Sequence, residues 1–383
     1  MNITEGIWRN SYASPDRLAV LLHGRAVTYA ALRNVADIAG IRLGLAGVSR
    51  GDIVAVAIAN PLGYLSVALA LARMGATSTP LKAGLQADVK QGLVQRHGVK
   101  WLVHDANEGW RSPSLAPDNH IAVDALYRAL EPGQRLAPPP AVHDVDDEPW
   151  HIALSGIAGT PQGNPQTHAR CLLTYTLGNQ SVHAPECRTL IFGDLANSMM
   201  FGEAIRSLLS GSSIVLALQV DPQAFFRLVE RDKPTRVLTS TGIAAKILAY
   251  AQSDMPDSLP KCASVKAFVT AGSRMPAALE RGLVTRVCPV VQINYGWAET
   301  GPIAVDEGSS VNKGRRGLRL RPWIEGEATD ERGEALPPGQ NGVLRFKSVF
   351  RDSWFYPGER GAIDEAGYLT LEGRVNSAQI VHA

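Results

Sequence analysis

The sequence predicts an α/β protein with two parallel-rich α/β subdomains in layers and a small antiparallel, β-barrel-like subdomain. Three observations support this fold class. Short apolar runs alternate with segments of helical periodicity in the first part of the chain. A second series of such segments follows a stretch rich in proline and acidic residues. From about residue 317, short strands separated by glycine-containing turns take over.

Alternating helices and strands are predicted in the N-terminal segment. Apolar residues from Leu32 to Leu43 recur at helical spacing, with Thr28 as the N-cap and Gly47 as the stop. The continuous apolar run 53–58 predicts a strand buried on both faces. The pattern also predicts helices at 65–75 and 89–96 and strands at 76–80 and 101–103. This alternation indicates a parallel sheet covered by helices.

Residues 131–149 are expected to be a linker or an exposed loop. Proline lacks a backbone donor, and the acidic run 144–148 resists burial. Beyond it, strands are expected at 189–192, 213–218, 236–238 and 265–270, with an apolar helix seam at 225–229. Short strands at 324–327, 342–347 and 367–371 make up the predicted antiparallel part.

Composition and charge narrow the functional classes. Hydrophobic residues make up 45% and charged residues 19% of the 383 residues, and the formal net charge is +2. Lysine and arginine are scattered, so neither nucleic acid nor an anionic membrane is indicated as a partner. We expect neither a signal peptide nor a membrane span, because the N-terminus lacks a basic start and no apolar run approaches about 18 residues.

Cysteine and histidine usage indicates where the protein works. The four cysteines lack a C-x-x-C spacing, so they are interpreted as reduced, structural thiols. The nine histidines form no H-E-x-x-H or comparable cluster, which argues against a transition metal held by the protein. The sequence therefore predicts a cytoplasmic protein.

The stretch from Ser155 to His168 carries the strongest sign of chemistry. It follows a strand predicted at 150–153 and contains three glycines and Pro161. Small residues let backbone N–H groups approach a ligand, and successive amides can bind an anion. The stretch is neither a Walker loop nor a G-x-G-x-x-G dinucleotide fingerprint. On these residues alone, phosphate binding and a plain turn both remain open.

The stretch resembles the phosphate loop of the acyl-adenylate-forming superfamily, which includes acyl-CoA synthetases, peptide-synthetase adenylation domains and luciferases. That loop reads S-G-T-T-G-x-P-K-G and ends in T-H a few residues later. The matching residues are Ser155, Gly156, Gly159, Pro161, Gly163, Thr167 and His168. Ile157 and Ala158 replace the two threonines, and Gln162 replaces the lysine. Segments 15–20, 27–32 and 51–56 also resemble the opening of the family.

Two further motifs resemble the adenylate site of the family. Residues 292–301 resemble the Y-G-x-T-E motif, which implies that Tyr295 lines the adenine and acyl sites and that Glu299 holds a magnesium ion. Without the rest of the pattern, a glutamate after a strand is usually a solvated end. Residues 267–276 resemble the strand and turn that floor the acyl pocket and meet adenine. The resemblance assigns nucleotide binding to Asn294, Tyr295, Gly296, Gly272 and Ser273. For Gly272, a left-handed turn is an equally compatible explanation.

The C-terminal part resembles the T-G-D, D-x-x-G-Y and G-R motifs. Glu359 stands in the place of the aspartate that accepts from the ribose hydroxyls, and Arg374 in that of the ribose-contacting arginine at the hinge. Residues 195–202 fall where related ligases often carry a gating histidine, although methionine and phenylalanine there are more often core residues. The predicted substrate pocket is mostly apolar and consists of Asn197, Phe201, Ala271 and Trp297, which favours an aryl or fatty acid over an amino acid.

The resemblance implies an acetyl-CoA synthetase-like fold with subdomains at 1–149, 150–316 and 317–372, and a hinge remnant at 373–383 without the C-terminal domain. The implied reaction joins a carboxylic acid and ATP into acyl-AMP with release of pyrophosphate, followed by transfer to the thiol of CoA or of a carrier protein. The implied catalytic residues are Glu299, Gln162 and His168, and the cofactors are ATP or AMP and Mg²⁺.

Two hypotheses about activity follow from the altered motifs. In the first, the chain is a ligase whose reaction is impaired or depends on a C-terminal domain supplied in trans. Loss of the threonine hydroxyls and of the lysine charge removes donors, each worth roughly 10²–10³ in rate. In the second, the chain is a catalytically dead homologue that binds a nucleotide, an acyl group or a protein partner.

Overall fold

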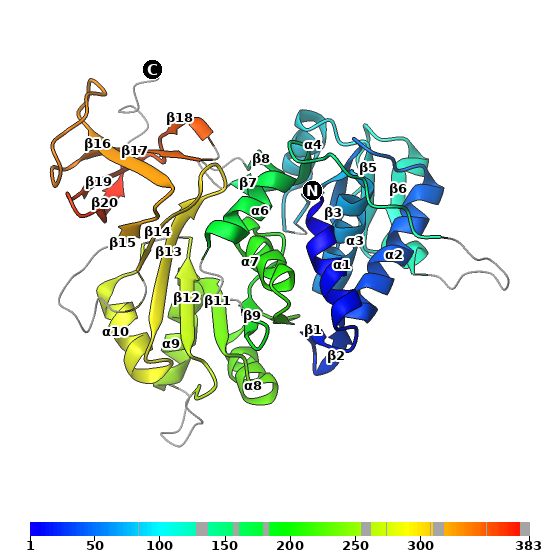
Figure 1. The fold of residues 1–383 in the computed structure, drawn as a ribbon, viewed down its shortest axis with the longest axis horizontal. Coiled ribbons are helices and arrows are strands. Elements are labelled where there is room, and N and C mark those ends of the chain that lie inside the picture. The colour runs from blue at the N-terminus through cyan, green and yellow to red at the C-terminus, as the bar shows by residue number, and fades with distance from the viewer. Residues whose placement is uncertain are drawn as a thin grey trace. The chain divides into compact units, whose positions relative to one another are not determined.

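The computed structural model describes residues 1–82, 84–127, 137–155, 161–178, 184–253, 262–272, 274–306, 308, 318–349 and 351–375. The chain divides into two compact units, Met1–Gln219 and Val220–Ala383. Figure 1 shows the helices and strands of both units as a ribbon. The predicted segments 1–149, 150–316, 317–372 and 373–383 stay predictions.

A parallel sheet forms one half of the N-terminal unit. Its strands are β3 (Ile53–Ala57), β4 (Thr77–Pro80), β5 (Trp101–His104), β6 (His120–Ala122), β7 (Pro149–Ser155) and β8 (Gln162–Thr167). Their order among the described residues is β6-β5-β3-β4-β7-β8. The pairs β3–β4, β3–β5, β5–β6 and β4–β7 are parallel, whereas β7 and β8 form an antiparallel hairpin at one edge. The first strand predicted for the second subdomain therefore belongs to the N-terminal sheet.

A second group of strands lies in the same unit. It consists of β1 (Leu18–Leu22), β2 (Arg25–Thr28), β9 (Arg188–Phe192) and β10 (Ser213–Leu216). β10 pairs in parallel with β1 and with β9, and β2 is antiparallel to β1. The helices of the unit are α1 (Ile3–Ala13), α2 (Tyr29–Ala46), α3 (Pro61–Met74), α4 (Ala87–Arg96), α5 (Val123–Leu126), α6 (His168–Leu177) and α7 (Ser198–Leu209), with a 3₁₀ turn at Pro117–Asn119.

The helix ends follow the capping residues in the sequence. The Thr28 hydroxyl accepts the Ala31 N–H at 3.1 Å and begins α2, which ends at Gly47 with a φ of 104°. The Asn60 side chain caps α3, which ends at Gly75 with a φ of 72°. Both glycines adopt the left-handed conformation that ends many helices, because other residues pay a steric cost there. The predicted helices and strands of this segment are confirmed.

Helix α3 is the centre of the N-terminal core. It packs against α2, β3 and β4, and Figure 1 shows it beside α2 and β3. Its apolar residues are buried on all sides rather than on one stripe, which explains why its sequence is apolar almost throughout.

The segment expected to be a linker or an exposed loop is partly described, from residue 137 onward, and it packs against the N-terminal unit. It has no regular structure before β7, as predicted, but Val145 is fully buried. The Val142 N–H donates to the Arg73 carbonyl at 3.0 Å, and the Val142 carbonyl accepts from the Asn2 amide at 3.2 Å. Asp144, Asp146 and Asp147 are exposed, as expected of a loop, whereas Val145 is buried and anchors the segment, a contact that composition alone conceals.

The C-terminal unit begins with parallel strands and helices. Its first elements are α8 (Pro222–Asp232), β11 (Arg236–Ser240), α9 (Thr241–Ser253), β12 (Ala267–Ala271), α10 (Ala277–Arg286), β13 (Val291–Trp297) and β14 (Gly301–Asp306). β12 pairs in parallel with β11 and with β13, and β14 turns back antiparallel to β13. Phe225, predicted to lie in a helix seam, is fully buried on α8.

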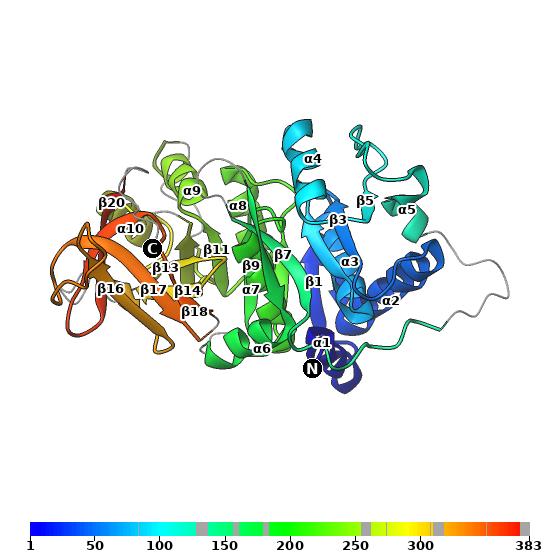
Figure 2. The same cartoon turned by 90° about the horizontal axis from the view of Figure 1, so that it is seen from above.

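The chain ends in antiparallel strands, as the sequence predicts. They are β15 (Leu318–Leu320), β16 (Ile324–Thr329), β17 (Gly342–Ser348), β18 (Arg351–Phe355), β19 (Glu359–Ile363) and β20 (Tyr368–Arg374). β17 pairs with β16, β18 and β19, and β20 pairs with β19 and β15. Figure 2 shows β16, β17 and β18 side by side. Their shared core contains Leu344 and Phe346, with Tyr295 and Trp297 of β13 packed against it.

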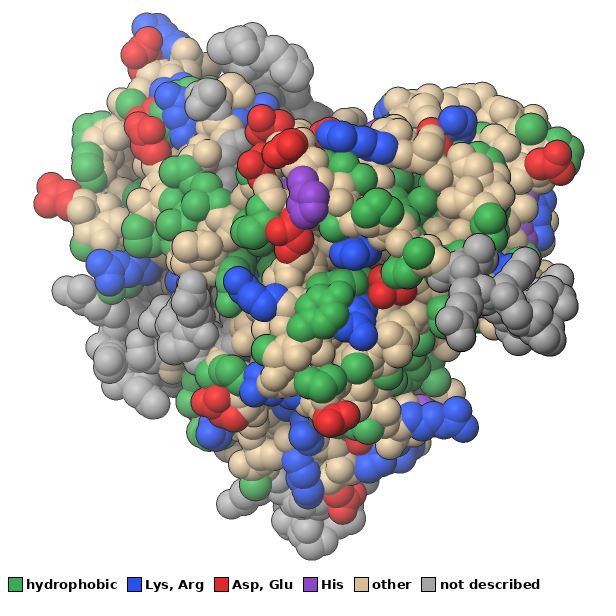
Figure 3. All heavy atoms as spheres, turned by 45° about the vertical axis from the view of Figure 1, so that its right-hand side comes forward, with side chains coloured by type: hydrophobic (Ala, Val, Ile, Leu, Met, Phe, Trp, Pro, Cys, Tyr) green, Lys and Arg blue, Asp and Glu red, His purple; other side chains and the backbone are tan. Residues whose placement is uncertain are grey.

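Charges on the surface are mixed, as the scatter of lysine and arginine along the sequence predicts. On the face shown in Figure 3, lysine and arginine side chains are interspersed with acidic and hydrophobic ones. Within the described ranges, no helix combines the length and apolar character needed to cross a membrane.

Asp52 ties the start of β3 to β5. Its carboxylate accepts from the Ser49 N–H at 2.9 Å, from Trp101 Nε1 at 3.0 Å and from Lys100 Nζ at 2.9 Å. Burial opposes ionisation of this carboxyl, but the hydrogen bonds from Lys100, Ser49 and Trp101 outweigh it and hold the pKa of Asp52 below its ordinary value.

Replacing this carboxylate should weaken the fold. Asp52→Asn keeps acceptors for Ser49 and Trp101 but loses the charge that pairs with Lys100, so we expect the free energy of unfolding at pH 7 to fall by about 1–3 kcal/mol. Because the folded pKa is depressed, the contribution is present above about pH 4 and lost as the pH falls through the folded pKa. Urea unfolding at pH 7 and pH 3 measures both effects. The exposed Asp16→Asn is the control, and an Asp52→Asn protein as stable as wild type at pH 7 would contradict this role.

Candidate functional site

The β7–β8 hairpin holds the two ends of the predicted phosphate loop. Across it, Leu154 lies opposite Gly163 and Ser155 opposite Gln162. Gln162 is exposed at the first position of β8. Gly156 and Gly159 lie outside the described residues, as do the replaced threonine positions. The described residues therefore place the two ends of the motif on paired strands.

Helix α4 contacts the second arm of the hairpin, and no sequence pattern indicates this contact. The Arg96 Nη1 donates to the Pro161 carbonyl at 3.1 Å. A Cβ on Gly163 would lie 2.2 Å from His97 Cε1 and 2.7 Å from Ile152 Cγ2. Gly163 therefore has a packing reason to be glycine, because the imidazole of His97 fills the space of a side chain.

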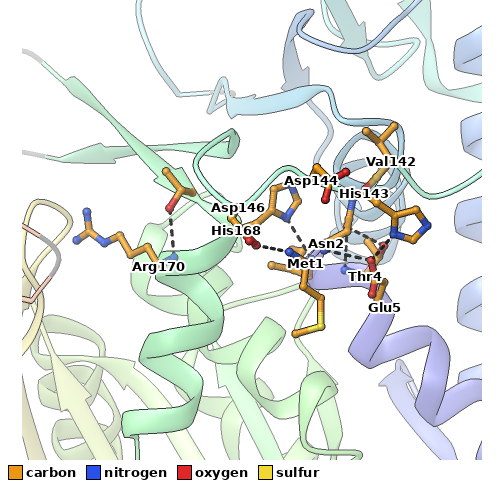
Figure 4. A network of polar contacts seen from close by, with 12 residues as sticks. Met1, Asn2, Thr4, Glu5, Val142, His143, Asp144, Asp146, His168 and Arg170 are labelled. Carbon is orange, nitrogen blue, oxygen red and sulfur yellow. Dashed lines mark hydrogen bonds and ion pairs between the residues drawn. The ribbon is translucent and has the colours of Figure 1, made fainter.

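His168 lies in a network that fixes the start of the chain (Figure 4). Its Nδ1 accepts the Ile3 N–H at 3.1 Å, and its side chain is buried. The Met1 amino group forms an ion pair with Asp146, and the Asn2 amide donates to the Ala72 carbonyl at 2.7 Å.

Burial, together with the charge of the N-terminal amino group, lowers the pKa of His168 to about 4. The imidazole is therefore neutral at pH 7, and its Nδ1 is the acceptor of this hydrogen bond. These are the contacts of a structural residue. The catalytic role predicted for His168 stays a prediction.

The predicted pocket residues of the N-terminal unit have structural contacts as well. The Asn197 side chain accepts the Met199 N–H at 3.0 Å and caps α7. Phe201 is 1% exposed, and its ring centroid lies 4.8 Å from that of His151 and 5.4 Å from those of Tyr64 and Trp150. This environment is that of a core aromatic residue. It supports the alternative that Phe201 belongs to the core rather than to a substrate pocket.

Several predicted nucleotide-site residues meet in the C-terminal unit. The Tyr295 hydroxyl donates to Glu359 Oε2 at 2.5 Å, and Trp297 Nε1 donates to the Tyr295 oxygen at 3.4 Å. Glu359 and Arg374 lie opposite each other in the β19–β20 ladder. Residues predicted from motifs about 60 to 80 positions apart thus form one cluster at the ends of β13, β19 and β20.

Burial and neighbouring charges shift the pKa values of Glu359 and Tyr295 in this cluster. Burial raises the pKa of Glu359 above its ordinary value, although the hydrogen bond from Tyr295 and the charge of Arg374 oppose the shift. Burial and the nearby Glu359 charge raise the pKa of Tyr295. The phenol therefore stays protonated at pH 7 and donates to the carboxyl group.

The strand ends around this cluster use glycine for two different reasons. A Cβ on Gly296 would lie 2.4 Å from the Gly301 carbonyl oxygen and 2.9 Å from Pro302 Cα, so the backbone of β14 excludes any side chain there. Gly272 has a φ of 97°, and no atom of the described residues lies within 4 Å of its Cβ position, so its conformation is what requires glycine.

The turn after β12 lies next to the predicted adenine side. Ala271 ends β12 opposite Asn294 of β13, and Ser273 lies outside the described residues. Arg274 Nη1 donates to the Glu372 carbonyl at 3.2 Å, which links this turn to β20. The turn and the ladder that carries Arg374 are therefore held together within the unit.

Glu299 lies on the turn between β13 and β14. Its Oε2 is buried and lacks a hydrogen-bond partner among the described residues. Among all residues that the structure describes, no group of three or more His, Cys, Asp or Glu side chains could hold a metal ion. An unsatisfied carboxylate oxygen fits a magnesium ion that is held by one carboxylate, by waters and by phosphates.

Parallel α/β strands followed by an antiparallel part are the fold expected of an adenylate-forming enzyme. The described fold is similar to the N-terminal domain of FACL13 from Mycobacterium tuberculosis, with a TM-score of 0.83, 19% identity, and coverage of 98% of this chain and all of that one. It is also similar to o-succinylbenzoate CoA synthetase from Bacillus subtilis in complex with its acyl-adenylate intermediate, with a TM-score of 0.81, 17% identity, and coverage of 96% and 78%.

The chain belongs to the AMP-binding enzyme family, which matches residues 7–350. Feruloyl-CoA synthase from Amycolatopsis is 28% identical over 397 aligned positions, which span 97% of this chain and 78% of that protein. The family and its acid–CoA ligase relatives support activation of a carboxylate to an acyl adenylate, and they do not favour the catalytically dead homologue. The predicted superfamily and fold class are confirmed.

Acid should weaken the fold through His168. Its pKa is about 4 in the folded protein and about 6.5 when unfolded, so its contribution to stability is complete above pH 6.5 and is lost as the pH falls towards 4. His168→Gln keeps an acceptor for Ile3, and we expect the loss of unfolding free energy between pH 7 and pH 5 to shrink by about 1–2 kcal/mol. Chemical denaturation at the two pH values measures it, with the exposed His143→Gln as control. An unchanged pH dependence would refute this role.

Gly163 should tolerate a methyl group poorly, chiefly because of His97. Gly163→Ala forces the imidazole aside, and such overpacking typically costs about 1–3 kcal/mol of stability. His97→Ala in the same protein should recover part of the loss, because Ile152 Cγ2 still lies 2.7 Å from the added Cβ. Gly109→Ala, where the added Cβ meets nothing within 4 Å, is the matched control. Thermal unfolding of the four proteins decides the question, and a stable Gly163→Ala single variant would show that the steric argument fails.

Proposed function

We propose that this chain activates a carboxylic acid, whose carboxylate attacks the α-phosphate of ATP to give an acyl adenylate and pyrophosphate. The observation that carries the proposal is the cluster of Tyr295, Glu359 and Arg374 in a chain whose family match spans residues 7–350. Catalysis of such a reaction consists largely of positioning the reactants and stabilising charge.

The proposed nucleotide site lies at the strand ends of the C-terminal unit. Glu359 and Arg374 would face the ribose, where a carboxylate can accept from hydroxyl groups and a guanidinium can donate. Asn294, Tyr295 and the turn at Gly272 and Ser273 would line the adenine side. The open backbone around Gly272 supports this assignment, because a planar base can approach it closely.

Glu299 would hold the magnesium ion, and its unsatisfied Oε2 supports this role. When bound to the triphosphate, Mg²⁺ neutralises the charge that develops on its oxygens. The phosphate-contacting roles that the resemblance assigns to Ser155, Gly156, Gly159, Gly163 and Gln162 are part of the proposal, with Gln162 as an uncharged donor.

The acid is proposed to be aromatic. Ala271 and Trp297 line the acyl side of the cluster and are apolar, and the relative named feruloyl-CoA synthase favours an aryl substrate over a fatty one. The acyl group is proposed to pass to the thiol of CoA. A carrier-protein thiol is the other acceptor, and a C-terminal domain supplied in trans is a proposed partner for that step.

ATP–pyrophosphate exchange tests the proposal. We expect exchange that depends on ATP, Mg²⁺ and an acid from a panel of aryl, fatty and amino acids, measured with the chain alone and with a relative's C-terminal domain added. Glu299→Gln should lower the rate by about 10²-fold or more, because it removes a charge that holds the ion.

The exposed Glu331→Gln is the matched control and should leave the rate unchanged. Absence of exchange with every acid, with and without the added domain, would refute the proposed activity. Exchange that survives Glu299→Gln would refute only the role of that carboxylate.

A further inference from the structure

The β7–β8 hairpin carries no cationic side chain of its own. Residues 149–167 contain neither lysine nor arginine. A triphosphate brought to this hairpin would meet backbone amides and the neutral Gln162 but no positive charge from either strand. Any charge that neutralises it must come from another element.

Helix α4 brings a guanidinium to the hairpin. Arg96 Nη1 donates to the carbonyl of Pro161, the residue directly before Gln162. The Arg96 side chain is exposed, and among the described residues no carboxylate lies within ion-pair distance of it. A guanidinium has five N–H donors, so most of them are left for a further acceptor.

Packing fixes this end of α4 against the hairpin. Leu93 and Val94 of α4 are buried in a cluster that also contacts Leu154 of β7. The next residue after Arg96, His97, occupies the space beside Gly163. The backbone that carries Arg96 is therefore held in place by the apolar contacts of Leu93 and Val94 and by the packing of His97 beside Gly163, independently of the bond to Pro161.

We propose that Arg96 is the phosphate-binding cation of this hairpin and takes the place of the positive charge that Gln162 does not supply. The inference rests on the proposed function for the identity of the ligand, a nucleoside triphosphate. A guanidinium binds phosphate oxygens through paired N–H groups, and the exposed Arg96 side chain has N–H groups beyond the one that donates to Pro161. The described residues of the site are Arg96, Pro161, Gln162 and Gly163.

A purely structural role for Arg96 makes a different prediction. An arginine in the last turn of a helix interacts favourably with the helix dipole, and the bond to Pro161 alone could position the strand. Arg96→Gln retains an N–H donor for Pro161 but removes the charge, whereas Arg96→Lys retains both donor and charge. A purely structural residue would change stability but leave anion affinity unchanged in Arg96→Gln, whereas a phosphate-binding cation would lose anion affinity in that variant.

The experiment measures binding of inorganic tripolyphosphate by calorimetry and the KM for ATP in the exchange reaction. We expect Arg96→Gln to weaken tripolyphosphate binding and raise the KM for ATP about tenfold or more. We expect Arg96→Lys to stay within about threefold of wild type. The difference between wild type and Arg96→Gln should shrink at high ionic strength, because exposed charges are screened.

Two further variants complete the test. Arg111→Gln is the matched control, since Arg111 is also exposed and donates to backbone carbonyls, those of Glu108 and Trp110. Gln162→Lys in the Arg96→Gln protein should restore tripolyphosphate binding by returning a charge to the hairpin.

The outcomes separate this inference from the proposed function. Tripolyphosphate binding that is absent from wild type, unchanged in Arg96→Gln, or lost equally in Arg96→Gln and Arg96→Lys would overturn the role of Arg96. Exchange activity with normal Arg96→Gln kinetics would leave the proposed function standing without it. Charge-dependent tripolyphosphate binding without any exchange would support the role of Arg96 while the proposed activity fails.

Discussion

The attachment of β7 to β4 is the interaction on which the N-terminal unit depends. The Thr77 hydroxyl donates to the Pro149 carbonyl at 2.5 Å, and the Ser78 hydroxyl lies 2.9 Å from His151 Nδ1. Burial lowers the pKa of His151 to about 3, so this imidazole stays neutral within the sheet. The hairpin that follows takes its position from the sheet. The hairpin itself is rich in glycine and carries no positive charge, so its position depends on the sheet.

In the C-terminal unit, the comparable interaction is the hydrogen bond between Tyr295 and Glu359. Glu359 is one methylene longer than an aspartate, and its carboxyl group reaches the Tyr295 hydroxyl. The bond joins β13 of the parallel layer to β19 of the antiparallel layer, beside the core around Phe346. Because both partners are largely buried, the pair is an electrostatic link between two kinds of sheet as well as a candidate ligand contact.

The sequence predicted the elements far better than the contacts between them. Thr28, Gly47 and Gly75 end helices for reasons that act within a few residues, and such local rules can be read from one segment. The approach of Arg96 to Pro161 joins residues 65 positions apart and leaves no local pattern. For the same reason, the sequence could not decide between a core and a pocket position for Phe201. The three aromatic rings that bury it come from distant parts of the chain.

The close antiparallel pairing of β13 and β14 at Gly296 limits which positions of the proposed acid site can vary. The opposing backbone lies so close that no side chain fits, and backbone, unlike a flexible side chain, cannot rotate away. Under the proposed function, changes in acid preference would therefore arise at other proposed positions, such as Ala271 and Trp297, rather than at Gly296. A mutagenesis library meant to broaden the range of acids should sample those two sites and leave the glycine untouched.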